Sequence, residues 1–555
     1  MKRALVLTMW GAALAGAIAA CGAASAQTQR PAAAKLYRIA GTVTNALTEE
    51  PVERATVSLV AEESRETLET TETEDGGRFA LAPVPAGKYG LRVSRRGYMS
   101  AFFDEHDEFS SAIVTGEGQD TEHIPFKVKP GAIVHGIVID DAGEPVDKAA
   151  VTLMRKSHSS GLGEQLTRSI SGVTDDRGEF EFWDLIPGTY LLAVRATPWF
   201  ALHPALNGNG ANAEQSSGAA ALDVVYPVTF YDGATEEAGA TPLTLGPGDQ
   251  PELNISVHAV PAVHLVVRTG ERESAQGQRF MDTPMLRQTV FGEDEFIAPG
   301  AVLPGPPGSG WVELAGVAPG HYSVMTGNPP RITEMDATGS GVVDVETANG
   351  APTARVDVTL RMADGTALPQ PLELMLISEE EISRRVPART NGQGEMRFEG
   401  VGPGTWTLVA RSNNLQLAVV GIQDSAGLRS DSRIEVKSHA LSLVAMLEAG
   451  TSRVQGFARK EGKPMAGAMI VLVPENPAGH WPMFRRDQSD SDGSFSMRDV
   501  APGRYTVVAI EDGWELDWAR AEVIGRYLKR GEAVIVSSQS GKVVSLPEAV
   551  TVQSR

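Results

Sequence analysis

The side chains that most often carry enzyme chemistry are scattered along this 555-residue chain and form no catalytic motif. None of the ten histidines is followed at the third position by glutamate, and no two lie at the spacing of metal ligands on a helix. A Gly-x-Ser-x-Gly nucleophile elbow and a phosphate-cradling loop are absent from the sequence. The single cysteine, Cys21, lies near the N-terminus. We therefore expect no catalytic residues, no metal ligands and no cofactor.

Aspartates precede two glycines in the sequence, and such groups of carboxylates are candidate calcium ligands. Calcium takes about six to eight oxygen ligands, more than either group offers alone. Aspartate before glycine is also ordinary turn chemistry, which is the interpretation we favour. The residues are Asp487, Asp490 and Asp492 before Gly493, and Asp175 and Asp176 before Gly178.

Aromatic residues outside the regular pattern are the best candidates for ligand binding. Aromatic faces stack on sugar rings or on peptide side chains, and a small cluster can supply most of the affinity of a site. The alternative is that the same rings lie in the core or between domains. The candidates are Trp199, Phe200, Tyr231, Trp481 and Trp514.

A sequence motif that occurs five times, which we call the phrase, predicts the elements that must hold these residues. Each copy has a glycine and an alternating stretch, then a second glycine ten residues after the first, followed two residues later by Tyr or Trp. The phrase predicts a strand, a tight turn and another strand. We expect positive φ at Gly188 and Gly503, as tight turns can require. The five turn glycines are Gly87, Gly188, Gly320, Gly404 and Gly503.

Two further strands precede the phrase in three copies. Opening strands are predicted at 39–43, 134–138 and 454–458, followed by the matching segments 51–59, 145–153 and 464–472. Many short strands with turn signals between them predict an all-β chain of β-sandwich domains with little helix.

This ordered set of motifs resembles carboxypeptidase regulatory-like domains over 36–129, 130–200 and 450–512. The resemblance implies transthyretin-like (prealbumin-like) sandwiches, related in architecture to Cna B-type repeats. It implies no particular function, because the family is named after an accessory domain. A Lys–Asn isopeptide cross-link, as in Cna B-type repeats, is not expected because the opening strands contain no lysine.

The spacing of the phrases predicts five tandem domains. The predicted divisions are a signal peptide (1–26), a linker (27–35), domain 1 (36–129), domain 2 (130–260, with an insertion at 201–221), degenerate domains 3 (261–352) and 4 (353–449), and domain 5 (450–555).

The N-terminus predicts export. Lys2-Arg3 precede an apolar stretch and then small residues, as in a secretory signal peptide. Residues 24–26 fit ordinary cleavage before Gln27, whereas residues 18–21 look like a bacterial lipobox that would lipidate Cys21. Both readings stay open, and they place the protein in the periplasm, on the outer membrane or outside the cell, with membrane contact only through a lipid anchor.

The net charge of −21 is spread along the chain, and basic residues cluster only in pairs, so nucleic acid is not an expected partner. We expect a non-catalytic envelope protein, a rod of modules that acts as a spacer and binds a protein or glycan. The alternatives are a carbohydrate-binding accessory protein for polysaccharide degradation or uptake, and a regulatory subunit of a secreted peptidase.

Overall fold

The chain is almost entirely β-structure, as predicted, and α2 (Ala521–Ile524) is the one α-helix among the described residues. The structure is a computed structural model that describes residues 35–204, 221–268, 271–273, 279–281, 283–306, 309–327, 331–338, 341–346, 351–380, 384–390, 395–412, 415–425, 427–437, 440–538 and 541–555. The predicted signal peptide, Cys21 and most of the insertion lie outside these residues. No helix in the described ranges combines the length and apolarity needed to cross a membrane.

The first unit packs two sheets around one hydrophobic core. Its opening strand β2 pairs antiparallel with β5 and parallel with β10, and the second sheet has the order β4-β3-β7-β8 with β9 also on β7. Alternate residues of β10 (Ile124, Phe126 and Val128) are buried in the core. The strands are β1 (Leu36–Tyr37), β2 (Ala40–Asn45), β3 (Thr56–Ala61), β4 (Thr67–Glu72), β5 (Arg78–Ala80), β6 (Val84–Pro85), β7 (Gly87–Arg95), β8 (Tyr98–Phe102), β9 (Ile113–Thr115) and β10 (Ile124–Val128).

The second unit repeats this arrangement. β11 lies between antiparallel β14 and parallel β19, and the second sheet has the order β13-β12-β15-β17. Gly136 in β11 allows the parallel strand to approach, because a Cβ there would lie 1.9 Å from the carbonyl oxygen of Leu253. The strands are β11 (Ala132–Ile139), β12 (Ala150–Ser157), β13 (Gln165–Val173), β14 (Glu179–Leu185), β15 (Gly188–Arg195), β16 (Val224–Val225), β17 (Thr229–Phe230), β18 (Leu243–Leu245) and β19 (Glu252–Ser256).

The third unit keeps both sheets although its sequence motifs are degenerate. β21 lies between antiparallel β27 and parallel β30, and the second sheet has the order β25-β24-β28-β29-β31. The strands are β20 (Val260–Pro261), β21 (Val263–Arg268), β22 (Glu271–Glu273), β23 (Arg279–Met281), β24 (Met285–Val290), β25 (Glu293–Ile297), β26 (Ala301–Pro304), β27 (Trp311–Val317), β28 (Gly320–Thr326), β29 (Arg331–Ala337), β30 (Gly341–Glu346) and β31 (Ala351–Pro352).

The fourth unit joins its two halves into one sheet. β32 lies between antiparallel β36 and parallel β41, and β38 pairs with both β37 and β41, so the sheet continues around the core. The strands are β32 (Ala354–Met362), β33 (Leu372–Ser378), β34 (Arg385–Pro387), β35 (Arg389–Thr390), β36 (Met396–Val401), β37 (Gly404–Ser412), β38 (Leu415–Asp424), β39 (Gly427–Arg429), β40 (Arg433–Val436) and β41 (Leu441–Gly450).

The fifth unit shares part of its core with the fourth, because Ala418 of β38 packs into it. β42 pairs antiparallel with β46 and parallel with β49, and β44 pairs with β47 as in the other units. The strands are β42 (Ser452–Lys460), β43 (Lys463–Pro464), β44 (Met469–Pro474), β45 (Arg485–Gln488), β46 (Ser494–Val500), β47 (Gly503–Glu511), β48 (Glu532–Val536), β49 (Val543–Ser545) and β50 (Val550–Ser554). Independent folding of any unit stays a prediction.

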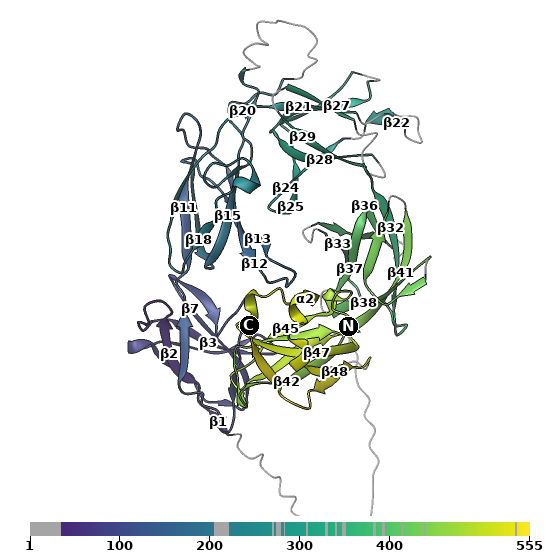
Figure 1. Ribbon diagram of the computed structural model, residues 1–555. Helices are drawn as coiled ribbons and strands as arrows, with labels where there is room; N and C mark the ends of the chain where they lie inside the picture. The colour runs from purple at the N-terminus through teal and green to yellow at the C-terminus, as the bar shows by residue number, and fades with distance from the viewer. Residues whose placement is uncertain are drawn as a thin grey trace, which may run out of the picture.

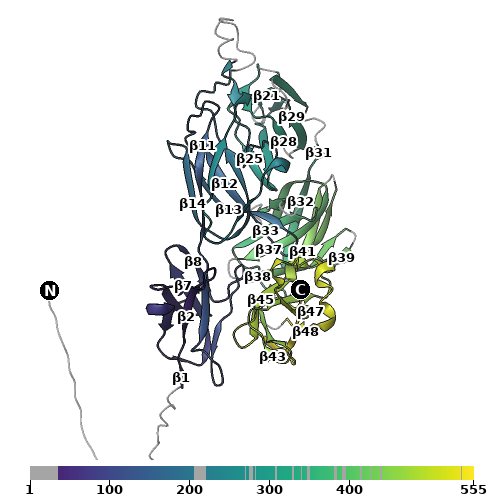
Figure 2. The same ribbon diagram turned by 60° about the vertical axis from the view of Figure 1, so that its left-hand side comes forward.

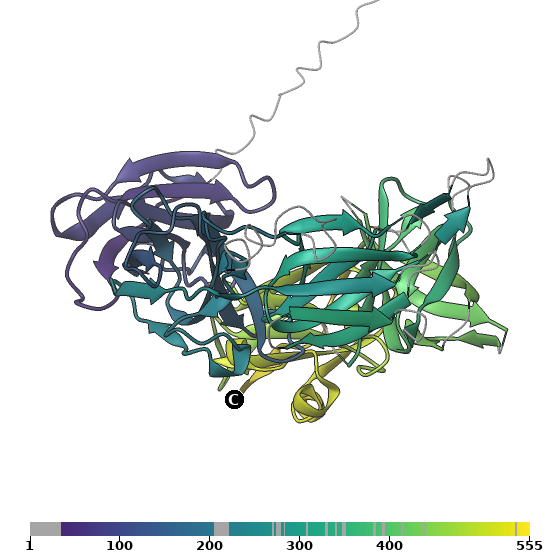
Figure 3. The ribbon, with the colours of Figure 1, turned by 90° about the horizontal axis from the view of Figure 1, so that it is seen from above.

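The units form a closed ring, so the expectation of a rod is wrong. The chain turns back and brings the fifth unit beside the first, as two views of the ribbon show (Figures 1 and 2). From above, the purple first unit lies at one end and the green fourth unit at the other (Figure 3). We call the contact between the first and fifth units the seam. It is built mainly by residues 104–114 and 486–491.

The expectation of positive φ is confirmed at one of the two turn glycines for which it was made. Gly188 has φ of 157°, whereas Gly503 does not have positive φ. The first glycine of the phrase also has positive φ, for example 73° at Gly178 and 80° at Gly493. A Cβ on Gly503 would lie 3.1 Å from the ring of Tyr505, so this glycine leaves room for the aromatic side chain.

Candidate functional site

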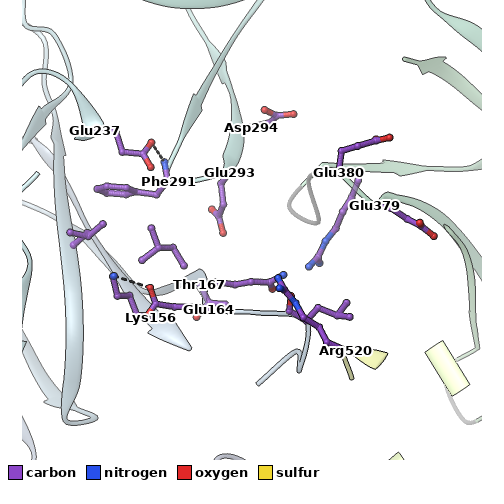
Figure 4. A pocket seen from close by; sticks show the side chains of 16 residues that line it. Lys156, Glu164, Thr167, Glu237, Phe291, Glu293, Asp294, Glu379, Glu380 and Arg520 are labelled. Atoms are coloured by element: carbon purple, nitrogen blue, oxygen red, sulfur yellow. Dashed lines mark hydrogen bonds and ion pairs between the residues drawn. The ribbon is translucent and has the colours of Figure 1, made fainter. Parts of the chain in front are cut away.

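The ring encloses a pocket of about 860 Å³, which we call the central pocket (Figure 4). Its walls come from four units that are far apart in the sequence. They are Lys156, Leu162, residues 164–167, Leu191 and Glu237 of the second unit, residues 291–294 of the third, Glu379, Glu380 and Arg385 of the fourth, and Arg520 of the fifth.

The β12–β13 hairpin forms one wall and also reaches the fifth unit. Lys156 Nζ pairs with Glu164 Oε1 at 2.8 Å across the hairpin. Arg520 Nε donates to the carbonyl oxygen of Leu162 at 2.7 Å, which fixes the hairpin tip against the fifth unit. This wall therefore presents both signs of charge in a held position.

The β24–β25 turn forms the opposite wall. The amide of Phe291 donates to Glu237 Oε2 at 2.8 Å, and the Phe291 ring packs on Phe230 with centroids 4.9 Å apart, so the second unit anchors this turn. Glu293 lies beyond it and pairs with Arg168 Nη2 at 3.1 Å. Hydrogen bonds from Arg168 to Glu295 and Glu293 raise the pKa of its guanidinium.

The fourth unit contributes Glu379, Glu380 and Arg385. Glu379 pairs with Arg433, whose pKa its hydrogen bond raises, and accepts a hydrogen bond from Thr407 Oγ1 at 2.9 Å. Glu380 Oε1 accepts from the amide of Thr405 in the turn phrase at 3.1 Å. Arg385, in contrast, is exposed, and its side chain forms no hydrogen bond or ion pair with another described residue.

Chemically, the central pocket is equipped to bind a polar ligand. Its acidic residues are held in position by partners inside the protein, so their carboxylate oxygens are fixed hydrogen-bond acceptors. Arg385 offers a guanidinium that is not shared with any described residue, while Leu162, Leu166 and Leu191 supply apolar surface.

None of the five predicted aromatic residues lines the central pocket. Trp199 is 84% exposed and packs edge-on against Phe200, with ring centroids 5.7 Å apart. Tyr231 is half-buried against the core of the second unit. Ligand binding by these three residues stays a prediction.

The other two predicted aromatic residues lie between units. Trp481 Nε1 donates to Thr407 Oγ1 of the fourth unit at 3.2 Å. Trp514 stacks on His106 of the first unit, with ring centroids 5.0 Å apart and planes 6° apart. Their surroundings match the alternative that these rings join domains.

The aspartates before the repeat glycines behave as turn residues. Asp175 Oδ1 accepts hydrogen bonds from the amides of Arg177 and Glu179 at 2.9 and 2.8 Å. Asp490 points into the seam, where it pairs with Lys88 and accepts from the amide of Ala112 at 2.8 Å. Within the described ranges, no three His, Cys, Asp or Glu side chains are placed to hold a metal ion.

Sequence reasoning missed the residues of the central pocket. Glu379 and Glu380 look like a solvated acidic run, and Lys156 and Glu164 look like the ends of an ordinary hairpin. No local signal joins them, because the pocket exists only once the ring closes.

Comparisons with known proteins bear on the fold of the first unit. The model of the carboxypeptidase regulatory-like domain matches residues 38–122. A search of curated proteins finds no match.

Solved structures similar to this chain include a Bacillus anthracis protein and several pilins, all at low identity. The Bacillus anthracis TIE protein is 9% identical with a TM-score of 0.17, over 95% of this chain and 76% of that one. The Streptococcal ancillary pilin is 10% identical with a TM-score of 0.20, over 56% and 99%. GBS52, the minor pilin of Streptococcus agalactiae, is 14% identical with a TM-score of 0.19, over 36% and 95%. With its strand order and the family match together, the segment 38–122 is a carboxypeptidase regulatory-like domain.

Proposed function

We propose that this chain is a non-catalytic exported envelope protein that binds a protein segment or a glycan in the central pocket. The observation that carries the proposal is the pocket wall, which four sequence-distant units build together. A spacer would have no need of such a shared pocket. Interfaces between domains are also a common location for ligand sites.

The pocket walls fit a polar, extended ligand. Fixed carboxylates such as Glu293 and Glu379 accept hydrogen bonds from hydroxyl or amide groups, and the unshared guanidinium of Arg385 donates to acidic or carbonyl groups. A volume of about 860 Å³ accommodates a short oligosaccharide or a few peptide residues.

A comparison of two charge reversals tests binding. The full mature chain would be applied to glycan arrays and used to capture partners from envelope extracts. We expect Arg385→Glu to abolish the strongest interaction, because it replaces the unshared donor in the pocket. Arg361→Glu, an exposed change on β32 outside the pocket, should leave that interaction intact. Equal binding by both variants would refute the pocket as the binding site.

The same captures separate the alternative functions. A secreted peptidase among the captured partners would indicate a regulatory subunit, and array hits restricted to glycans would indicate a carbohydrate-binding accessory protein. Metabolic labelling with a fatty-acid analogue tests the anchor, since Cys21→Ser should remove the label and release the protein from membranes if the lipobox is used.

A further inference from the structure

A second cavity, of about 370 Å³, lies at the seam. The first unit contributes residues 60–63, Arg65, Gly90, residues 108–110 and Ala112, and the fifth unit contributes Arg486, Asp487, Asp490 and residues 496–498. It shares no lining residue with the central pocket. The two units therefore build a separate hollow where they dock.

Negative charge predominates in this seam cavity. Five acidic side chains and three arginines line it. The charge of Arg486 is already paired outside the cavity lining. Its side chain is only 3% exposed, pairs with Asp107 Oδ2 at 3.1 Å and lies against three aromatic rings. Arg498 reaches Glu62 only at 3.9 Å. Lys88 pairs with Asp490, and Arg453 pairs with Glu63 at 3.3 Å, so Asp487 and Glu108 are the lining carboxylates that form no ion pair with a described residue.

Three polar atoms of the lining are buried without a hydrogen-bond partner: Glu62 Oε2, Ser496 Oγ and Arg486 Nε. A buried polar atom that forms no hydrogen bond costs about 1–3 kcal/mol. Glu62 Oε2 would accept a hydrogen bond, Arg486 Nε would donate one, and Ser496 Oγ could accept or donate. A ligand with both a charged donor and a hydroxyl group would satisfy them.

The pKa values of the cavity carboxylates also favour a cationic ligand. Burial raises the pKa of Asp487 to about 6, and it raises the pKa of Asp490 to about 7 despite the ion pair with Lys88. The charge of Glu62 raises both values further. A cation in the cavity would favour the ionised carboxylates, so its binding should release protons.

We propose that the seam cavity binds a small organic cation with a primary ammonium group and a hydroxyl group, held between Glu62 of the first unit and Asp487 of the fifth. An ammonium group provides three donors for carboxylates, whereas no three His, Cys, Asp or Glu side chains of the described residues are placed to hold a metal ion. The site would also couple the ligand to closure of the ring, since both units contribute to it.

Isothermal titration of the full chain with two matched probes tests the proposal. 4-Amino-1-butanol and 1,4-butanediol differ by one ammonium group and are otherwise similar in length and shape. We expect the amine to bind and the diol not to bind. Affinity should rise between about pH 5 and pH 8 as Asp487 and Asp490 ionise near Glu62, Lys88, Arg486 and Arg498, with protons released on binding.

Three variants locate the site. Asp487→Asn and Glu62→Gln remove one charge from each unit with little change in shape and should each weaken amine binding about tenfold or more. Asp492→Asn lies on the same hairpin outside the cavity and should bind as the native chain does. A melting curve for each variant shows that it is folded. Equal binding of the diol, undiminished binding by both cavity variants, or no binding of the amine at all would each overturn the proposal.

Discussion

The aromatic residue that ends each turn phrase donates a hydrogen bond to the carbonyl oxygen four residues earlier. The five bonds differ in residue type and burial but share this geometry, which ties the turn to the strand that follows it. They run from Tyr89 to Pro85 (3.1 Å), Tyr190 to Ile186 (2.6 Å), Tyr322 to Ala318 (2.8 Å), Trp406 to Gly402 (3.0 Å) and Tyr505 to Ala501 (2.8 Å).

Removal of one such hydroxyl should destabilise its unit. Tyr505→Phe leaves the buried carbonyl of Ala501 without its partner, and we expect a loss of about 1–2 kcal/mol, seen as a lower melting temperature by calorimetry. Tyr89→Phe is the matched control, because that bond is exposed and longer and water can replace the hydroxyl. A larger effect at Tyr89 than at Tyr505 would contradict this account.

The two glycines of the phrase should differ in their tolerance of a side chain. At Gly493 φ is 80°, and a Cβ would lie 2.6 Å from the carbonyl oxygen of Ala458, so Gly493→Ala should cost about 1–3 kcal/mol or more. At Gly503 φ is not positive, and the Cβ meets only the edge of a ring at 3.1 Å, so Gly503→Ala should cost less. Chemical denaturation measures the loss of stability in each variant. A larger loss for Gly503→Ala than for Gly493→Ala would show that the backbone conformation is not the cause.

At the scale of elements, a buried histidine joins the second and third units. His264 of β21 is 3% exposed, and its ring nitrogens contact Asp223 Oδ2 at 2.5 Å and Glu313 Oε1 at 2.7 Å. Asp223 also pairs with His203 Nδ1 at 3.0 Å. Contact of both ring nitrogens with carboxylates favours the imidazolium form.

This contact should make stability depend on pH. Burial lowers the pKa of His264, but the hydrogen bonds and charges of Asp223 and Glu313 outweigh it and raise the pKa above its ordinary value of 6.5. A raised histidine pKa contributes stability that is complete below 6.5 and is lost as pH rises through the folded-state value. The melting temperature should therefore fall on the alkaline side of neutrality, and His264→Gln should flatten that dependence. An unchanged pH profile in the variant would show that His264 is not responsible.

The repeated strands were the part of the fold that the sequence could predict. Alternation and turn residues are local signals, and even the third and fourth units, whose opening motifs are degenerate, keep an opening strand between one antiparallel and one parallel neighbour. The central pocket could not be predicted, because Arg385 and Arg520 acquire a common environment only through contacts between units. Gly503 was misjudged because its role depends on the ring of Tyr505 and not on its own backbone.

At the scale of the whole molecule, the seam decides the shape. His106 and Ser111 of the first unit bond to Gln488 and Ser489 of the fifth at 3.2 and 2.9 Å. Lys88 and Asp490 add an ion pair whose carboxylate is 8% exposed. Removing one partner of a buried ion pair is strongly destabilising. A substitution in this pair should therefore separate the first unit from the fifth.

A charge reversal in the seam should release the first unit. Lys88→Glu places a second carboxylate beside Asp490, and we expect a larger radius of gyration by small-angle X-ray scattering while the units stay folded. Lys127→Glu is the control, because Lys127 is exposed and its ion pair stays within the first unit. Lys127 Nζ lies 3.8 Å from Glu49 Oε1. Identical scattering from the two variants would mean that the seam does not hold the ring closed.

The seam also fixes when the ring can form. Its hydrogen bonds join residues 377 to 402 positions apart in the chain, and the fifth unit leaves the ribosome after the other four. Domains generally fold in the order of their synthesis, so the docking surface of the first unit would stay uncovered until the fifth unit has been synthesised. Ring closure is thus a late step in biogenesis, and a chain that stops before residue 486 would display the bare surface of the first unit to other proteins.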